Sequence, residues 1–154
     1  SAVGEVNVVE QMRKVKAPIG GEGNGGVILA ELHHGRDALV GIALFLTLLA
    51  KRGIGASALR RSYPDYFISK NKIELQAGMD VQAIVDAMEE RHRARPHSTV
   101  DGLRIEFGRE WVHLRRSNTE PIVRIYAESE SPAAANALAH RIMAEMKEVA
   151  AAVR

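Results

Sequence analysis

Three strand-like segments between residues 103 and 126 constrain the fold of this chain most. Residues 103–107 alternate apolar and charged side chains, which is the pattern of a strand with one buried face. A turn at residues 108–110 leads into a second strand at residues 111–114, so these two segments form a hairpin. The apolar, β-branched run at residues 122–126 then returns along the hairpin. Together these segments predict an antiparallel sheet.

Helical patterns flank these strands. A strand is expected first, at residues 66–75, and Asp80 then caps a helix whose apolar side chains share one stripe: Val81, Ile84, Val85 and Met88. Ser131 and Pro132 have the order of a cap and a first helical position, and the helix that follows buries Leu138, Ile142, Met146 and Val149. The order of elements predicts an α+β fold, in which a four-stranded antiparallel sheet carries two helices on one face.

The first third of the chain has a different pattern. Apolar residues recur at helical spacing over residues 6–16, and Pro18 stops the pattern. A short strand is expected at residues 27–29. Asp37 then caps a helix over residues 38–51, which is apolar nearly all round and is therefore expected to lie buried between layers. Residues 1–56 offer too few strands for a whole sandwich, so they predict an incomplete domain.

Composition excludes several classes of protein. Lys and Arg total 21 against 19 acidic residues, a net charge of +2 that does not indicate a nucleic-acid binder. The chain has no cysteine, which excludes disulfides and cysteine catalysis. The longest apolar run, residues 38–50, is shorter than the about 20 residues that a membrane span needs. We expect a cytoplasmic protein without a secretory signal or membrane partner. Because the chain begins with Ser1 rather than Met, we expect a piece of a longer protein.

The connection between the last two strands has the chemistry of a phosphate site. Residues 114–121 read Leu-Arg-Arg-Ser-Asn-Thr-Glu-Pro. A guanidinium such as that of Arg115 offers a fork of donors suited to phosphate oxygens. The hydroxyls, the amide and the backbone N–H groups that follow can line an anion-binding concavity. A polar hairpin loop without a ligand is the structural alternative.

A glycine-rich segment at residues 20–26 contains Gly-x-Gly-x-x-Gly at Gly21, Gly23 and Gly26. A dinucleotide fingerprint needs a strand before it and a helix after it. Here a helix is expected before the segment and a strand after it, so the context is inverted. Either the segment is a flexible turn, or it holds Glu22 and Asn24 toward sugar hydroxyls, because a carboxylate accepts hydrogen bonds and an amide both donates and accepts them.

Two further clusters of residues have the composition of a functional site, one of a metal site and one of a nucleic-acid site, but their sequence context disfavours both. The first, Glu31, His33, His34 and Asp37, has the residue types of a metal site. Adjacent histidines in a strand point to opposite faces, so we expect a polar loop and no metal. The second, residues 91–97, is basic but has no interleaved aromatic residue. It is expected to be a solvated helix end, favoured by the helix dipole, rather than a nucleic-acid site.

Both loops resemble loops of the α-D-phosphohexomutases, the family of phosphomannomutase, phosphoglucomutase and phosphoglucosamine mutase. The run Arg115-x-Ser117-Asn118-Thr119-Glu120-Pro121-x-x-Arg124-x-Tyr126 resembles the phosphate-binding loop of their C-terminal domain. Residues 21–26 are similar to the sugar-binding loop of their third domain, usually written Gly-Glu-x-Ser-Gly-His. In this chain Asn24 replaces the serine and Gly26 replaces the histidine, so a role of that histidine does not carry over.

The resemblance implies a domain division and a fold for each part. Residues 1–56 would be the C-terminal part of an α/β/α third domain, residues 57–65 a hinge, and residues 66–154 a TATA-binding-protein-like fourth domain. The implied site residues are Arg115, Ser117, Asn118, Thr119 and Arg124 for the substrate phosphate, and Glu22 and Asn24 for sugar hydroxyls. Arg116 is a weaker candidate, because the family commonly has a small residue or proline there.

The resemblance also implies what the parent enzyme does. Such an isomerase, an intramolecular phosphotransferase, interconverts the 6-phosphate and 1-phosphate of mannose, glucose or glucosamine. Its phosphoserine lies on the first domain and its magnesium-binding, Asp-rich loop on the second, and neither sequence occurs here. We therefore expect no catalytic residue, metal or cofactor in this chain, and no activity of the chain alone. Its partners would be the phosphosugar and domains 1 and 2, with no nucleic acid.

Two alternatives remain open from the sequence. In the first alternative, the chain is a non-catalytic anion-binding module for phosphosugars or nucleic acid, and its binding would depend strongly on salt. In the second, exposed apolar surface on the incomplete first part would promote self-association.

Overall fold

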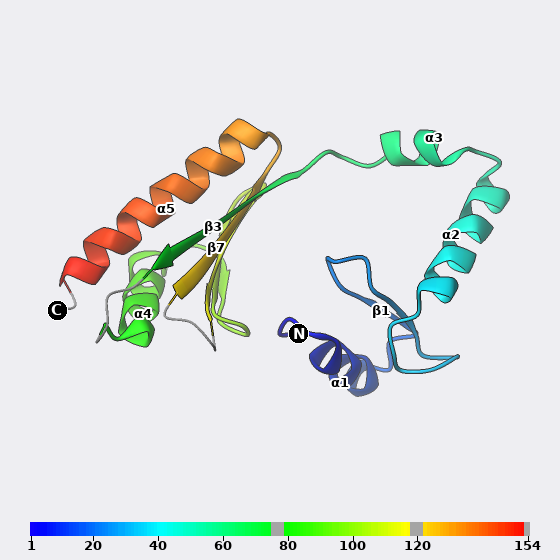
Figure 1. The fold of residues 1–154 in the computed structure, drawn as a ribbon, viewed down its shortest axis with the longest axis horizontal. Helices are drawn as coiled ribbons and strands as arrows, with labels where there is room; N and C mark the ends of the chain where they lie inside the picture. The colour runs from blue at the N-terminus through cyan, green and yellow to red at the C-terminus, as the bar shows by residue number, and fades with distance from the viewer. Residues whose placement is uncertain (75–78, 118–121, 153–154) are drawn as a thin grey trace. The chain divides into compact units, whose positions relative to one another are not determined.

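The computed structural model describes residues 1–74, 79–117 and 122–152. The chain forms two compact units, Ser1–Pro64 and Asp65–Arg154. The elements of the first unit run from α1 to α3 and those of the second from β3 to α5, as the colours of Figure 1 show along the chain. Because each unit has its own packing, we describe each by itself.

The first unit is a hairpin flanked by helices. Helix α1, Glu5–Val15, leads into strands β1, Ile19–Gly21, and β2, Val27–Leu29, which pair antiparallel with Gly21 opposite Val27. Met12 of α1 and Ile28 of β2 are buried. The Met12 and Val8 side chains lie so close to Gly20 that a side chain there would collide with them, so α1 packs directly against the hairpin backbone.

Helix α2, Ala38–Arg52, corrects one expectation. Its N-terminus is capped as predicted, with Asp37 accepting hydrogen bonds from the backbone N–H groups of Leu39 and Val40 at 2.8 and 3.1 Å. However, none of its residues is buried, although its apolar composition predicted a helix between layers. The reason is that residues 1–64 contain only two strands, each of three residues, which is too little sheet to cover a helix of 15 residues. Val27 of β2 packs close to Gly41 of α2, where a Cβ atom would lie 3.3 Å from Val27 Cγ2.

The segment interpreted as a linker also begins with a helix. Residues Ala56–Arg61 form α3, and Leu59 on it is buried. Ala, Leu and Arg are strong helix formers, so a short helix at the start of this segment agrees with its composition. In the part of the chain that the structure describes, no helix is both long and apolar enough to cross a membrane.

The second unit confirms the predicted α+β class and adds one strand. Its antiparallel sheet has the order β3-β7-β6-β5-β4. The strands are Phe67–Glu74, Ile122–Ser129, Glu110–Arg116, Leu103–Phe107 and His97–Ser98 in that order. The fifth strand, β4, was missed because it has only two residues, too few to show an alternating pattern. It pairs His97 with Ile105 at the edge of the sheet.

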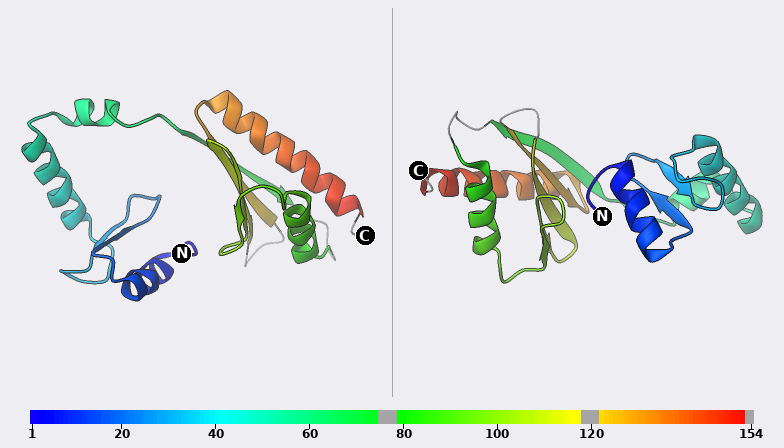
Figure 2. Two further views of the ribbon diagram at one scale, coloured as in Figure 1. Left: turned by 180° about the vertical axis from the view of Figure 1, so that it is seen from behind. Right: turned by 90° about the horizontal axis from the view of Figure 1, so that it is seen from below.

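Helices α4, Val81–Arg91, and α5, Pro132–Ala152, cover one face of this sheet (Figures 1 and 2). Asp80 caps α4 by accepting from the backbone N–H groups of Gln82 and Ala83, as predicted. Alternate strand residues point into the core that the helices close. The fully buried members include Leu103, Ile105, Val112, Leu114, Val123, Ile125, Ala127, Met88 and Ile142.

The opposite face of the sheet carries the intervening residues. Because neighbours along a strand alternate between faces, the register places Arg115 and His113 of β6 beside Arg124 and Tyr126 of β7. Lys72 of β3 lies opposite Arg124. We call this surface the outer face.

The packing predicts a large stability difference between two Ile→Ala substitutions. Ile125→Ala removes atoms from the fully buried core, so it should lower the free energy of unfolding of the second unit by about 2–5 kcal/mol. Ile42→Ala, at an exposed position of α2, should leave that unit unchanged within about 0.5 kcal/mol. Urea unfolding followed by fluorescence of Trp111, the single tryptophan, measures both. Equal effects of the two substitutions would contradict the assigned core.

Candidate functional site

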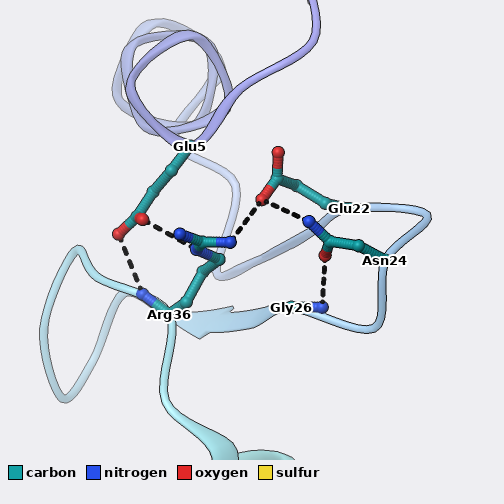
Figure 3. Close-up of polar contacts among 5 residues, drawn as sticks. All are labelled: Glu5, Glu22, Asn24, Gly26 and Arg36. Carbon is teal, nitrogen blue, oxygen red and sulfur yellow. Dashed lines mark hydrogen bonds and ion pairs between the residues drawn. The ribbon is translucent and has the colours of Figure 1, made fainter.

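The glycine-rich loop between β1 and β2 brings its two predicted site residues together. Glu22 closes the loop by donating its backbone N–H to the Gly26 carbonyl at 3.0 Å. The Asn24 side chain donates to Glu22 Oε2 at 3.3 Å and accepts from the Gly26 backbone N–H at 2.9 Å (Figure 3). Gly25 has a φ of 92°, a conformation that favours glycine. The loop therefore holds a carboxylate and an amide side by side.

A cation that the sequence interpretation missed completes this arrangement. Arg36, which lies just before the Asp37 cap of α2, contacts Glu22 Oε2 through Nη1 at 3.3 Å. The same guanidinium donates from Nε to Glu5 Oε2 at 2.7 Å, and the Arg36 backbone N–H donates to Glu5 Oε1 at 3.1 Å. Glu5, in the first turn of α1, is thus tied to the loop through Arg36 (Figure 3).

Glu5 and Arg36 shift each other's pKa. The hydrogen bond from the Arg36 backbone N–H, followed by that from its side chain, holds the pKa of the Glu5 carboxyl below its ordinary value. Its hydrogen bond to Glu5 in turn raises the pKa of Arg36. Glu5 and Arg36 are therefore both ionised at neutral pH. The Glu22 side chain is only 10% exposed, so its carboxylate is held largely out of water beside this pair.

Glu5, Asn24 and Arg36 of this cluster border an open hollow of about 420 Å³, and Glu22 lines a separate, smaller hollow of about 200 Å³. Residues from three segments line the larger hollow: Glu5, Asn24, Gly25, Gly26, Val27, Arg36, Asp37 and Ala38. Polar atoms therefore reach the larger hollow from the hairpin loop, from the start of α1 and from the start of α2. Such a concave surface with a few convergent polar groups suits a small polar ligand.

The cluster that resembled a metal site is a helix cap. Asp37 is held by its cap bonds and contacts His33 Nε2 through Oδ2 at 3.1 Å. The hydrogen bond from the Val40 backbone N–H, followed by the contact to His33, lowers the pKa of Asp37. Within residues 1–74, 79–117 and 122–152, no group of three or more His, Asp or Glu side chains is placed to hold a metal ion.

The predicted phosphate loop is described at its two ends. Ser117 donates its backbone N–H to the Ile122 carbonyl at 3.0 Å, which closes the β6–β7 hairpin, and the Ser117 residue is buried. Asn118 and Thr119 lie outside the described residues. The structure therefore describes the two strands that flank the loop, β6 and β7, together with Ser117.

The two predicted arginines on these strands are cross-strand neighbours. Arg115 lies opposite Arg124, and Lys72 lies opposite Arg124 on its other side. These three residues form a row of cations across the outer face, which we call the cationic row. Arg115 Nε also contacts Asp101 Oδ1 at 3.2 Å. Lys72 and Asp101 were not predicted, because only the strand register and the β6 packing bring them to the arginines.

Arg116 points to the other face. It lies opposite Val123, a core residue, whereas its neighbour Arg115 lies opposite Arg124. Its exposure at the end of β6 keeps its charge in solvent. The structure thus separates the two adjacent arginines of the loop, and only Arg115 belongs to the cationic row.

The basic cluster at residues 91–97 is largely paired within its own unit. Arg91 contacts Glu145 and Glu148 of α5, at 3.7 and 3.0 Å. Arg93 pairs with Glu90, and His97 lies 3.4 Å from Glu89. Nearby acidic side chains therefore offset much of this positive charge.

Comparison with known proteins identifies both parts of the chain. Residues 1–66 match the model of the phosphoglucomutase/phosphomannomutase alpha/beta/alpha domain III, and residues 71–145 match that of the phosphoglucomutase/phosphomannomutase C-terminal domain. A solved structure of a phosphoglucomutase/phosphomannomutase family protein from Burkholderia thailandensis aligns with a TM-score of 0.70 and 27% identity, over 98% of this chain and 31% of that one.

Named relatives agree with these matches. The phosphoglucosamine/phosphogalactosamine mutase of Sulfurisphaera tokodaii is 32% identical over 91% of this chain. The phosphoglucomutase/phosphomannomutase of Thermococcus kodakarensis is 36% identical over 84% of it. The matched regions are only 31% and 28% of those two relatives. This chain therefore belongs to the phosphoglucomutase/phosphomannomutase family and corresponds to its domain III and C-terminal domain regions.

Proposed function

We propose that this chain is the substrate-binding C-terminal part of a phosphohexomutase, an isomerase that interconverts the 6-phosphate and 1-phosphate of a hexose. The observation that carries the proposal is the cationic row on the outer face, which consists of Lys72, Arg124 and Arg115. It lies near the end of β6 and the start of β7, beside the connection between these strands. Family membership supports the same conclusion.

The cationic row is an arrangement that calls for an anion. Like charges directly opposite one another on adjacent strands destabilise a sheet. Asp101 offsets part of the charge at Arg115. Lys72 contacts Glu74 at 3.3 Å, but both side chains are mostly exposed, so that pair contributes little. A phosphate monoester, with a charge of about −1.5 to −2 at neutral pH, would relieve the repulsion and accept the forked donors of the arginines.

The sugar end of the substrate needs different chemistry, and the glycine-rich loop supplies it. Within the described residues, both side-chain contacts of Glu22 fall on Oε2, and Figure 3 shows its other oxygen pointing away from them. That oxygen can accept hydrogen bonds from sugar hydroxyls. Asn24 adds an amide that both donates and accepts. We assign Glu22 and Asn24 to the hydroxyls, and Arg115, Ser117, Asn118, Thr119 and Arg124 to the phosphate, with Lys72 as an addition.

These residues bind and orient the substrate without reacting with it. Phosphoryl transfer depends mainly on positioning and charge stabilisation, so binding of the non-reacting phosphate aligns the other end of the sugar. We propose that the transferring phosphoserine and a Mg²⁺ site lie on domains 1 and 2 of the parent enzyme. The described residues hold no acidic cluster fit for Mg²⁺, and no step assigned to this chain passes through the ion.

The proposed substrates are phosphates of glucose, mannose or glucosamine. The relatives are named as mutases of phosphorylated glucosamine, galactosamine, glucose and mannose. The Glu22 carboxylate and the Asn24 amide would recognise hydroxyl groups that these sugars share. Binding of nucleic acid is disfavoured by the pairing of the basic cluster at residues 91–97 with nearby glutamates. A cytoplasmic location follows from the same proposal.

Binding should depend on which face of the sheet carries an arginine. Arg124→Ala removes the middle of the cationic row, so it should weaken binding of glucose 6-phosphate about tenfold or more, the loss of one charge-assisted hydrogen bond of roughly 1.5–3 kcal/mol. Arg116→Ala is the matched control, because it removes an exposed arginine from the opposite face. NMR titration of the 154-residue chain measures both affinities. Equal weakening would remove the assignment of the row.

The chain alone should have no mutase activity. It lacks the proposed phosphoserine and metal domains, so incubation with glucose 1-phosphate and Mg²⁺ should yield no glucose 6-phosphate by ³¹P NMR. The mutase of Thermococcus kodakarensis, a relative more than three times the matched length, serves as the positive control. Conversion by the purified chain would show that the reacting groups lie within these 154 residues.

A further inference from the structure

Arg36 holds a place that the assignment of substrate-binding residues does not use. Its guanidinium joins Glu5 at the start of α1 to Glu22 in the glycine-rich loop, with contacts of 2.7 and 3.3 Å. In Figure 3 the contacts run as one chain, from Glu5 through Arg36, Glu22 and Asn24 to the Gly26 backbone. A disturbance at Arg36 therefore reaches both residues that we assign to sugar hydroxyls.

The stem of Arg36 also explains the glycine at position 26. A Cβ atom added to Gly26 would lie 2.6 Å from Arg36 Cδ and 3.2 Å from Arg36 Cγ. The first distance is shorter than carbon atoms adopt and the second is unusually tight, so the Arg36 side chain occupies most of the space that a side chain at position 26 would need; Asn24 Oδ1 lies 3.2 Å from the same point. The backbone φ of Gly26 does not itself require glycine. Packing against Arg36 therefore selects glycine at this position.

We propose that Arg36 is a positioning residue for sugar recognition. It packs against Gly26 and sets the orientation of the Glu22 carboxylate. This inference rests on the proposed function. The Arg36 backbone N–H and Nε both donate to the Glu5 carboxylate, which holds the guanidinium, and the contact to Glu22 Oε2 then holds that second carboxylate. The other carboxylate oxygen is thereby held in one direction, where it can accept from a sugar hydroxyl without first having to be ordered.

The geometry of the guanidinium matters as well as its charge. Arginine presents its donors in a rigid, planar fork, so one side chain can meet two carboxylates at once. A lysine at this position would supply the charge from a single flexible ammonium group. If Arg36 only neutralised the two glutamates, Arg36→Lys would restore function. If Arg36 orients Glu22, Arg36→Lys should behave much like Arg36→Ala.

The test compares a sugar phosphate with a ligand that has no sugar. Arg36→Ala should weaken binding of glucose 6-phosphate to the 154-residue chain about three- to tenfold, as expected for the loss of one ordinary hydrogen bond. Binding of inorganic phosphate should be unchanged, because it has no hydroxyl for Glu22 to recognise. A residue with only a structural role would weaken neither ligand selectively. NMR titrations give both affinities, and thermal unfolding shows whether each variant is folded.

Gly26→Ala tests the packing argument independently. The added methyl group should displace Arg36 and weaken glucose 6-phosphate binding by a similar factor. In the Arg36→Ala background the same substitution should weaken binding by a clearly smaller factor, because the Arg36 Cδ and Cγ atoms are gone and only the tight contact of 3.2 Å to Asn24 Oδ1 remains. Additive effects would contradict the idea that Gly26 acts through Arg36. Should Arg36→Ala fail to fold, Arg36→Lys and Gly26→Ala still measure the selectivity.

The outcomes separate this inference from the proposed function. If the unmodified chain binds glucose 6-phosphate and Arg124→Ala weakens that binding, the proposed function survives whatever Arg36 does. Within that result, unchanged sugar phosphate affinity in Arg36→Ala, or full recovery in Arg36→Lys, overturns the positioning role. If the unmodified chain binds neither ligand, the proposed function itself fails and the inference fails with it.

Discussion

The register between β6 and β7 is the constraint on which the second unit depends. Leu114 lies opposite Ile125 in the core, and the next pair along, Arg115 opposite Arg124, lies on the outer face. A slip of one residue would turn each of these side chains to the other face. It would place arginines in the core and expose the apolar residues, so packing of α4 and α5 holds the register. The cations stay in place because the other face is buried.

The first unit is organised by polar contacts to a greater degree. Its buried apolar residues are few, with Met12 and Ile28 packing α1 against the hairpin. The ion pairs of Arg36 with Glu5 and Glu22 tie the start of α1 to the glycine-rich loop and the start of α2. A loop held by hydrogen bonds can present polar groups to a ligand, whereas an apolar core cannot. The exposed apolar side chains of α2, among them Leu39, Ile42 and Phe45, show how little of this unit the hairpin covers.

Much of the secondary structure could be predicted because its signals are local. Asp37 and Asp80 cap the helices they were expected to cap, since a side chain that accepts from backbone N–H groups two or three residues on needs no distant partner. The strand at residues 103–107 likewise follows from alternation along the chain, and the apolar, β-branched run at residues 122–126 predicted the first part of β7, which continues to Ser129. Two predictions were wrong because they depended on surroundings. The sheet has five strands rather than four, because the two-residue β4 forms only by pairing with β5. Helix α2 is exposed rather than buried, because the first unit has too few strands to cover it.

The sequence by itself determined the class of the second unit, the places of most helices and strands, and the residue types of both candidate loops, because periodicity, capping and turn chemistry act between near neighbours. Only the tertiary structure decided which cations share a face, since Lys72 meets Arg124 across more than fifty residues through strand pairing. Only the tertiary structure brings Arg36 into contact with Glu5 and Glu22 and packs its side chain against Gly26. Contacts between distant segments depend on how elements pack, and no local pattern in the chain encodes the partner.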